Sequence, residues 1–393
     1  MTSAPSTGET GARPIAVDRV TSAADRRAFL NLPRRIYADD PQWIEPLRKE
    51  EAKRIDPQRH PFYEHGEGAF WLARRPGKNG AEVVGRIGAV INRLHLEKCD
   101  DATGHFSLLE AIDDQDVFDA LFDAAADWLR EKGMRRVLGP FNLSINEELG
   151  LMIEGFEKPP MIMMGHTRPY YGVRVEAAGF TKAKDLYAFI QDLEKPMPDV
   201  WSERLNEILL RNDAKIYRAT RKTLLDDMRR AIDIYNDAWS ENWGALPITA
   251  RETLELYKAV KPVIAPEAVV FAERNGEAFA IMAAIPNINE AIRDLHGRLL
   301  PFGWIKVLWR FRVNRLKSGR IFLLGVRKAY QGTLLGAMIA ILLIENIRDV
   351  ARDYGFRWAE LSWVLEDNKK IIDYLEAYGC ERYKTYRIYE KSL

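Results

Sequence analysis

The stretch RIFLLGVRKAYQGTLLG, residues 320–336, decides the fold of this chain. Residues 321–326 form an apolar run rich in β-forming side chains, and a glycine-bearing turn follows. A long amphipathic helix is expected next, over residues 335–354. A strand, a glycine turn and a helix N-terminus in this order make a site where backbone N–H groups and the helix dipole can hold a pyrophosphate.

The composition limits the classes of protein that fit. The length of 393 residues suggests two or three domains, and 58 Lys+Arg against 57 Asp+Glu give a net charge of +1. No global field therefore points to nucleic acid. Two cysteines, Cys99 and Cys380, cannot build a disulfide framework and favour a reducing compartment.

The sequence shows no candidate for a membrane span. Residues 1–13 are small and polar, without an apolar core typical of a signal peptide, and we expect a disordered tail. The longest strongly apolar run, residues 334–344, is shorter than the ~20 residues that a span needs. We therefore expect a cytoplasmic protein, either soluble or peripheral on the inner face of the membrane.

The same order of elements occurs twice along the chain. Residues 14–192 begin with a strand and a helix, continue with a hairpin over residues 69–91, and contain a helix over residues 116–132. Residues 193–213 are interpreted as a linker with a helix in it. Residues 214–393 then repeat the pattern.

In the second half the helix is expected over residues 224–239 and the hairpin over residues 268–285, turning at Asn275-Gly276. The stretch quoted above and the C-terminal segment complete this half. Two short alignments support the repeat, and they match residues 128–146 with 350–368 and residues 175–180 with 375–380.

The connection between the two aligned segments is longer in the first half, and the additional residues fall within residues 147–171. A period of this length indicates tandem domains rather than a solenoid. We predict an α/β architecture with mixed sheets, built from two domains of one fold.

The order strand, Q-x-x-G loop, helix, strand, asparagine, helix and aromatic-glycine pair resembles the GNAT (Gcn5-related) N-acyltransferase superfamily. The resemblance covers all of residues 214–393 and, more weakly, residues 14–192. It implies two tandem GNAT folds and an acyl-coenzyme A donor. In its sharpest form the resemblance is to bacterial ceramide-synthase-type acyltransferases.

The resemblance implies a donor site after the strand. Its loop residues are Gln331, Gly332, Thr333, Leu334, Leu335 and Gly336. Leu334 stands where the family has a glycine that lets the backbone approach the phosphate, so we expect a weakened or shifted phosphate site. Val326 is implied to offer its N–H to the thioester oxygen, and Asn368 to contact the pantetheine arm. Arg327 and Lys328 could supply positive charge.

The equivalent loop of the first half is residues 109–114, LEAIDD, which contains no glycine. Its carboxylates would repel a pyrophosphate, although they are also ordinary helix caps. We therefore expect only residues 214–393 to bind coenzyme A. The first half would shape the acceptor pocket.

The residues that move protons are harder to assign. Leu375 stands where the family has its general-acid tyrosine, so no residue is assigned to protonate the leaving thiolate. An amine acceptor must lose a proton before or during attack on the thioester. Glu366, just past the second strand, is the first choice as general base, and Glu148 and His166 from the first half come next.

Two segments rich in polar and aromatic groups are candidates for acceptor binding. The residues concerned are Asn142, Asn146, Tyr170, Tyr171, Asn242 and Trp243. Loop packing or core packing alone would explain them equally well. The sequence HPFYEH, residues 60–65, is one residue too long for a zinc motif of the H-x-x-E-H type, and we expect no metal.

Residues 300–320 combine Trp, Phe and Leu with several Arg and Lys. This composition is typical of a helix that lies on anionic lipid, which would make the protein a peripheral membrane protein. A stripe packed against the core, with the basic side chains in solvent, remains open as the alternative.

The sequence therefore predicts an N-acyltransferase that moves an acyl group from coenzyme A to an amine, with a long acyl chain and a lipid (sphingoid) amine as the sharpest version. Two alternatives remain at this point. One is a degenerate GNAT pair that binds a ligand without catalysis, and the other is a Fem-like transfer of an aminoacyl group from tRNA. The near-neutral charge counts against the second.

Overall fold

The computed structural model describes residues 14–78, 80–195, 209, 211–313 and 316–393. The predicted N-terminal tail and most of the predicted linker helix lie outside them. The described strands form one mixed sheet. In chain order these strands are β1 (Ala16–Arg19), β2 (Gly66–Gly77), β3 (Gly80–Asn92), β4 (Thr103–Ala111), β5 (Arg136–Gly139), β6 (Leu151–Glu154), β7 (Thr181–Asp192), β8 (Ala214–Arg218), β9 (Val269–Arg274), β10 (Glu277–Pro286), β11 (Ser318–Val326), β12 (Trp358–Leu365) and β13 (Glu381–Ser392).

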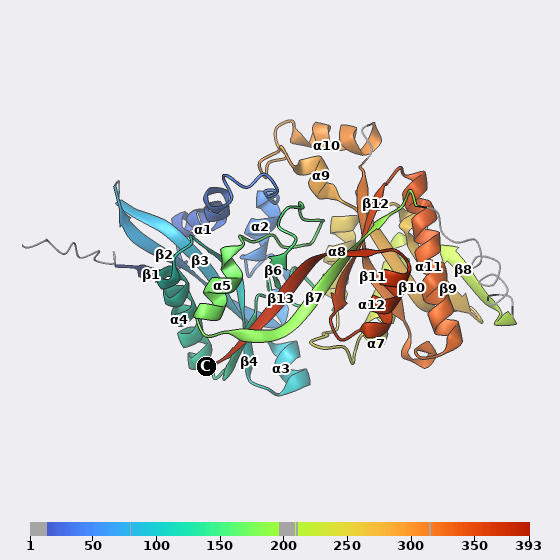
Figure 1. The fold of residues 1–393 in the computed structure, drawn as a ribbon, viewed down its shortest axis with the longest axis horizontal. Helices are drawn as coiled ribbons and strands as arrows, with labels where there is room; N and C mark the ends of the chain where they lie inside the picture. The colour runs from blue at the N-terminus through green and yellow to red at the C-terminus, as the bar shows by residue number, and fades with distance from the viewer. Residues whose placement is uncertain (1–13, 79, 196–208, 210, 314–315) are drawn as a thin grey trace, which may run out of the picture.

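Helices cover both faces of this sheet (Figure 1). The α-helices are α1 (Ala23–Ile36), α2 (Arg48–Arg54), α3 (Arg93–Cys99), α4 (Gln115–Glu131), α5 (Tyr170–Ala177), α7 (Leu224–Ala238), α8 (Ala250–Val260), α9 (Ile288–Ile292), α10 (Gly303–Arg312), α11 (Leu334–Asp353) and α12 (Lys369–Ala377). In the first half, α4 packs on β2 and β3, and α1 packs on β3 and β4. In the second half, α11 packs on β9, β10 and β11, and α7 packs on β10 and β11.

The predicted hairpins and helices are confirmed, and local chemistry explains their ends. Ser22 caps α1 in a capping box with Asp25, and Asp114 caps α4 by accepting from the Asp116 N–H. The β9–β10 hairpin turns at Asn275 and Gly276, which both have positive φ (54° and 80°), as a tight two-residue hairpin turn requires.

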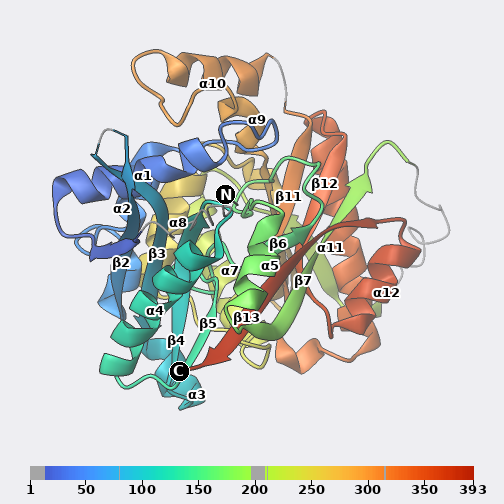
Figure 2. The same cartoon turned by 60° about the vertical axis from the view of Figure 1, so that its left-hand side comes forward.

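The last strand of each half crosses to the other half, which the sequence did not predict. The sheet order is β1-β2-β3-β4-β5-β13-β7-β12-β11-β10-β9-β8. The first half's last strand, β7, pairs with β12, and the chain's last strand, β13, pairs with β5. Figure 2 shows β7 and β13 running side by side through the centre. The halves therefore share one sheet, and the division into residues 14–192 and 214–393 stays a prediction.

The longer connection predicted within residues 147–171 contains the short strand β6, which pairs with β13, and a loop that follows it. Side chains from both halves meet beneath this connection in one buried cluster. It includes Leu138, Met152, Met161, Leu186, Tyr386 and Ile388. The connection thus packs the first half against the crossing strands at the middle of the sheet.

Candidate active site

A wedge-shaped gap opens in the sheet between β11 and β12. The two strands pair in parallel only from Ser318–Ile321 against Trp358–Leu361. Beyond that point β11 continues to Val326 while paired with β10, and a register shift between Ala283 and Ala284 leaves Phe322 as a bulge. Backbone groups on the free side of β11 therefore face the gap rather than another strand.

Two of these backbone groups are N–H donors. The Arg327 N–H donates to Phe279 O (2.8 Å), on the side of β10. Because backbone groups of alternate residues in an antiparallel ladder point to opposite sides, the N–H and C=O groups of Val326 and Leu324 face the gap. Trp239 Nε1 donates to Leu324 O (2.9 Å) and Gln331 Nε2 to Val326 O (2.8 Å). In the described residues neither N–H of this pair has a hydrogen-bond acceptor.

The turn after β11 leads into α11 at the open end of the gap. Gly332 has φ 72°, which a side chain would strain, and a Cβ there would meet no atom within 4 Å. Thr333 caps α11, because its Oγ1 accepts from the Gly336 N–H (3.0 Å). Gly336 is needed for packing, since a Cβ would lie 2.1 Å from Tyr330 O.

Leu334 does not distort this turn. It is the first residue of α11, where the backbone is helical and needs no glycine, and its side chain is 73% exposed. Thr333 caps the Gly336 N–H and not the Leu334 N–H, which points out of the first turn of the helix, where an anion binds. The next residue, Leu335, is buried in the core beneath the turn. The backbone is therefore unstrained at the position where the family has a glycine, and the weakened or shifted phosphate site stays a prediction.

The basic residues beside the turn are held by carboxylates of α7 and of the segment after it. Arg327 pairs with Asp233 (2.5 Å), and Lys328 pairs with Glu241 (2.5 Å). Both carboxylates are mostly exposed, and exposed pairs contribute little stability. Lys328 can therefore turn to a bound anion at small cost, whereas Arg327 is also held by Ala278 O, to which its Nε donates (3.1 Å). Asn368 caps α12, accepting from the Ile371 N–H (3.5 Å) at the far strand of the gap.

The corresponding gap of the first half is closed by the chain itself. β4 and β5 pair in parallel only over Thr103–His105, as β11 and β12 do over their first residues. Here, however, Asn142 Oδ1 accepts from the Leu108 N–H (3.0 Å), and the Phe141 N–H donates to Phe106 O (2.9 Å). Asp114 caps the next helix and pairs with Arg75 (2.6 Å), which is the ordinary role expected for a carboxylate there.

A buried ionic cluster lies at the closed end of the β11–β12 gap, and sequence reasoning missed it. Arg320 and Glu360 are opposite each other in the ladder, 1% and 0% exposed, with Arg320 Nε 3.4 Å from Glu360 Oε1. Arg320 Nε donates to Ser362 Oγ (2.8 Å), and Ser362 Oγ donates to Glu360 Oε1 (2.6 Å). Tyr383 from β13 donates to the other carboxylate oxygen. A glutamate inside the apolar run of residues 358–365 was the available signal.

His166, one of the predicted bases, is held by the carboxylate of Asp40. Its Nε2 lies 2.9 Å from Asp40 Oδ2, and its Nδ1 is buried without a hydrogen-bond partner in the described structure. Burial lowers the pKa of His166 although Asp40 pulls it upward. The His166 ring is therefore neutral near pH 7. Because a carboxylate only accepts, Nε2 carries the hydrogen and Nδ1 a free lone pair.

The loop before His166 runs over the buried cluster. Arg320 donates to the Ile162 and Met163 carbonyls (3.2 and 3.4 Å), a few residues before His166 in the chain. Tyr386 of β13 donates to Gly165 O (3.3 Å). These bonds hold the His166 loop against the closed end of the gap.

The other two predicted bases are engaged elsewhere. Glu366 accepts from the Asp185 N–H (3.1 Å) and pairs with Lys182 (2.5 Å). Glu148 lies 3.4 Å from Arg54 and accepts from the Asn142 side chain (3.3 Å). Among the three candidates, His166 is the one with a buried side-chain atom that has no hydrogen-bond partner in the described structure, Nδ1.

The two segments predicted to bind the acceptor do meet between the halves. Asn146 accepts from Tyr235 OH (2.8 Å) and donates to Leu246 O (3.3 Å). Asn242 forms the turn beside Leu246, donating to Trp239 O (2.8 Å). Trp243, in the same turn, packs on the central buried cluster.

Three predicted acceptor residues lie apart from this place. Tyr171 is fully buried and donates to Glu110 (2.6 Å), while Tyr170 donates to Ala111 O (2.7 Å). Both sit in the first half's own core, and Asn142 plugs the first half's gap. For these three side chains the structure supports the packing interpretation, because their polar atoms are already bonded within the first half.

The histidines of HPFYEH contact acidic side chains separately: His60 lies 3.5 Å from Glu147, and His65 lies 3.1 Å from Glu252. Within the described ranges, His95, Cys99 and Asp101 are the residues close enough to share a metal ion. Asp101 is already bound there by His95 and by Arg136 (2.5 Å).

The stripe predicted within residues 300–320 is not buried in helix α10, so the core-stripe interpretation is wrong for this helix, although Val307 packs on a small cluster with Ile44 and Ile292. None of its residues is buried. Its large apolar side chains are roughly half exposed, including Trp304 (47%) and Trp309 (53%), and Phe302 before it is 71% exposed. α10 projects away from the sheet in Figures 1 and 2. No helix in the described ranges is long and apolar enough to cross a bilayer.

Comparison with known proteins finds two relatives that match this chain over almost its whole length. No family model matches it. It is 43% identical over 386 residues to a Caulobacter vibrioides (strain NA1000 / CB15N) protein named bacterial ceramide synthase, covering 96% of this chain and 98% of the relative. It is 38% identical over 370 residues to Protein YghO of Escherichia coli (strain K12), covering 94% and 93%.

Among solved structures, a tandem GNAT protein from the clavulanic acid biosynthesis pathway matches with a TM-score of 0.53. The match covers 96% of this chain and 98% of that protein, at 12% identity. A likeness at this identity concerns the fold, and it confirms the prediction of a mixed α/β structure of the tandem GNAT type.

Proposed function

The chain belongs to the family of the bacterial ceramide synthase, N-acyltransferases with a tandem GNAT fold, and we propose that it transfers an acyl group from coenzyme A to an amine held between the halves. One observation carries the donor assignment. The β11–β12 gap is open, with two unbonded N–H groups on its wall and a helix N-terminus at its mouth. The equivalent gap of the first half is plugged by Asn142 and has a carboxylate at its mouth.

The donor enters along β11. Its pyrophosphate binds at the turn, where Gly332 leaves open space and the first N–H groups of α11 are free. Its pantetheine arm follows the strand into the gap, with Asn368 on the opposite side. The N–H of Val326, or that of Leu324 two residues deeper, donates to the thioester oxygen and stabilises the negative charge that develops on it.

The acceptor amine comes from the face covered by the loop of residues 155–169. Its lone pair attacks the thioester carbonyl carbon, a C–N bond forms, and the C–S bond then breaks to release coenzyme A as a thiolate. The nitrogen must lose one proton in this sequence. His166 Nδ1 takes it, because this lone pair is free and Asp40 holds the ring and stabilises its charged form. The thiolate then receives a proton from His166 or from solvent.

The finer identity of the substrates follows from the relative's name and from α10. A ceramide is an N-acylated sphingoid base, so we propose a long acyl chain and a sphingoid amine. The exposed Trp and Phe side chains around α10, with basic residues beside them, suit the surface of an anionic membrane. The enzyme would then work on the inner face of the membrane and meet its lipid acceptor there.

The non-catalytic alternative rested on Leu334 and Leu375. Leu334 is an exposed helical residue with ordinary backbone geometry, whereas Leu375 is a core residue of α12 and supplies no proton donor. No feature of the described residues favours a tRNA donor over acyl-coenzyme A.

A thiol-release assay tests the proposal. The protein is incubated with acetyl-, octanoyl- and palmitoyl-coenzyme A, each with and without sphinganine or a soluble primary amine. The proposal expects thiol release that needs both a donor and an amine, with an N-acyl product detected by mass spectrometry. Donor hydrolysis that no amine accelerates, or the absence of any donor binding by calorimetry, contradicts it.

A further inference from the structure

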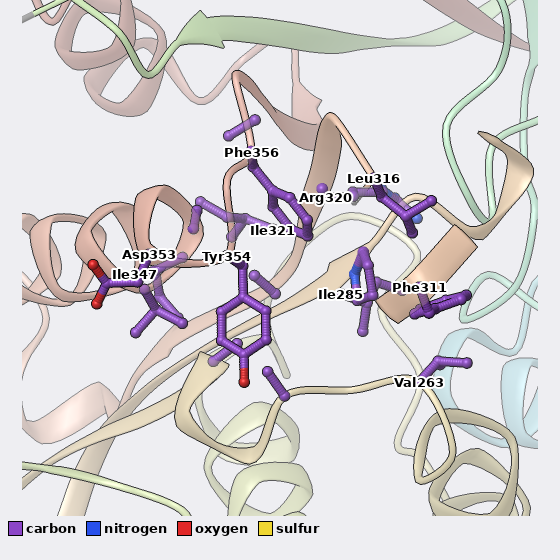
Figure 3. Close-up of a pocket in the computed structure, with 18 of the residues that line it drawn as sticks. Val263, Ile285, Phe311, Leu316, Arg320, Ile321, Ile347, Asp353, Tyr354 and Phe356 are labelled. Atoms are coloured by element: carbon purple, nitrogen blue, oxygen red, sulfur yellow. The ribbon is translucent and has the colours of Figure 1, made fainter. Parts of the chain in front are cut away.

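An apolar cavity of about 320 Å³ lies at the far end of α11 from the donor turn. Its walls come from β10, β11, α11, the segment after α8 and the segment that contains α10. Residues from these walls include Ala265, Ile285, Phe311, Ile321, Ile347 and Ala351. In Figure 3, Phe311 and Leu316 lie on one side of the cavity and Ile347 on the other.

The size and lining of the cavity point to a ligand. Ligand pockets are typically clefts of roughly 300–1,000 Å³ lined mostly by apolar side chains. This cavity is of that kind, and it is bordered by the exposed residues Arg312, Asp353 and Tyr354. A lining this apolar does not hold water well but does hold hydrocarbon. The volume accommodates on the order of ten groups the size of a water molecule or a methylene, at about 30 Å³ each.

The cavity lies on the same strand and helix as the donor turn. β11 runs from Gly319 and Ile321, in the cavity wall, to Val326 beside the turn. α11 runs back from Gly336 at the turn to Ile347 in the cavity wall. Five residues of strand and eleven residues of helix both span about 17 Å. The strand and the helix therefore cover the same distance, about 17 Å, between the donor turn and the cavity.

Ile321 connects the cavity to the gap. It is the last residue of β11 that pairs with β12, and its side chain belongs to the buried cluster on the α11 face. The Arg320 guanidinium bonds to the His166 loop on the opposite face, donating to Ile162 O (3.2 Å), and Arg320 also forms part of the cavity wall. A chain that continues beyond a thioester in the gap therefore meets apolar side chains on the α11 face and charged groups on the other face.

We propose that this cavity binds the hydrocarbon chain of the acyl donor, with the methyl end farthest from the coenzyme A turn. This inference rests on the proposed function for the identity of the donor, but the hydrocarbon site itself does not. The donor's chain is the proposed occupant because β11 and α11 lead from the donor turn to the cavity, although Ile285 and Arg320 reach the cavity from the other side of the sheet. Phe311, in the wall, belongs to the exposed helix α10, so a chain can reach the cavity from an apolar surface.

Filling the cavity tests the proposal. Ala351→Trp places a large side chain in the cavity from α11, and Ala265→Phe does so from a different wall. Arg352→Trp is the matched control, since it puts the same side chain on the exposed side of the same helix turn. Thermal unfolding of each variant establishes that it is folded. Three probes are titrated by calorimetry: free palmitate, sphinganine, and the series acetyl- to palmitoyl-coenzyme A.

In the wild type and in Arg352→Trp, we expect palmitate to bind and donor affinity to rise by up to about fourfold per methylene, then to level off near ten to twelve carbons. In each filled variant that folds, palmitoyl-coenzyme A binding should weaken at least tenfold while acetyl-coenzyme A binding stays within twofold. If the proposed function is wrong but the hydrocarbon site is real, neither the wild type nor any variant should bind coenzyme A donors, while palmitate should still bind the wild type and bind Ala351→Trp more weakly. Palmitate and donor binding that both filled variants leave unchanged, or a filled variant that weakens only sphinganine binding, overturns the proposal.

Discussion

Replacing His166 with glutamine should remove the base while keeping the hydrogen bond that holds it. The amide nitrogen of Gln occupies about the position of His Nε2, so it can still donate to Asp40, now at 2.9 Å from that atom. What disappears is the buried Nδ1 lone pair. Packing on the Tyr37 ring, at 5.7 Å between centroids, changes little, so we expect the free energy of unfolding to fall by about 1 kcal/mol.

The effect on catalysis should be much larger. A positioned general base contributes about 10²- to 10⁴-fold, which corresponds to about 2.7–5.5 kcal/mol in the barrier. Because burial holds the pKa of His166 below 6.5, the wild-type rate should fall only as the pH drops under 6.5, and the variant should lack this acidic limb. Thiol release from palmitoyl-coenzyme A with saturating amine, measured from pH 5 to pH 9, gives both quantities.

A matched control separates catalysis from folding. His105 is also buried and its Nδ1 also lacks a partner, but it lies on β4, packed against His95 and Phe141 rather than against Asp40. His105→Gln should cost stability without altering the pH profile. If His166→Gln keeps its rate within threefold of the wild type, with the acidic limb intact, His166 is not the base and the assignment of the acceptor face loses its main support.

Three further predictions follow from particular contacts. Arg320→Met leaves Glu360 buried without its cation and should lower the free energy of unfolding, measured with urea, by about 3–5 kcal/mol. Adding Glu360→Leu should recover at least half of that loss. If the effects of the two substitutions simply add, the two side chains are not coupled. Gly336→Ala puts a Cβ against Tyr330 O and should cost about 1–3 kcal/mol and weaken donor binding, both of which an unchanged melting curve and Kd would refute. Joint replacement of Trp304 and Trp309 by alanine should reduce sedimentation with anionic liposomes severalfold, while Val173→Ala, exposed on α5, should not; equal sedimentation removes α10 from the membrane contact.

Much of the fold could be predicted because its signals are local. Capping residues such as Ser22 and Thr333, and turn residues such as Asn275-Gly276, act within a few positions of the chain. The repeat of these signals predicted two domains of one kind. The exchange of β7 and β13 could not be predicted in the same way, because a strand's alternation shows which face is buried but not which strand lies beside it.

In the candidate site, too, the features that are local in sequence could be predicted, and those that depend on distant residues could not. The turn of residues 331–336 could be located because its glycines and its helix start are contiguous. The Arg320–Glu360 pair could not, because the two residues are distant in sequence and only the parallel register brings them together. His166 was a candidate, but the orientation of its ring and the position of its hydrogen depend on Asp40, which comes from a distant segment of the chain. For α10, periodicity showed which residues share a face, and only the structure shows that nothing in the described chain covers it.

Calorimetric titration of the protein with palmitoyl-coenzyme A, carried out on the wild type, Gly332→Glu and Asp113→Asn, tests the central claim most directly. Gly332 lies at the open turn of the second half, and Asp113 lies at the plugged equivalent, paired with Arg174. The account predicts one donor per chain in the wild type and in Asp113→Asn, and no binding in Gly332→Glu. Two donors per chain, or one donor that survives Gly332→Glu, would contradict it.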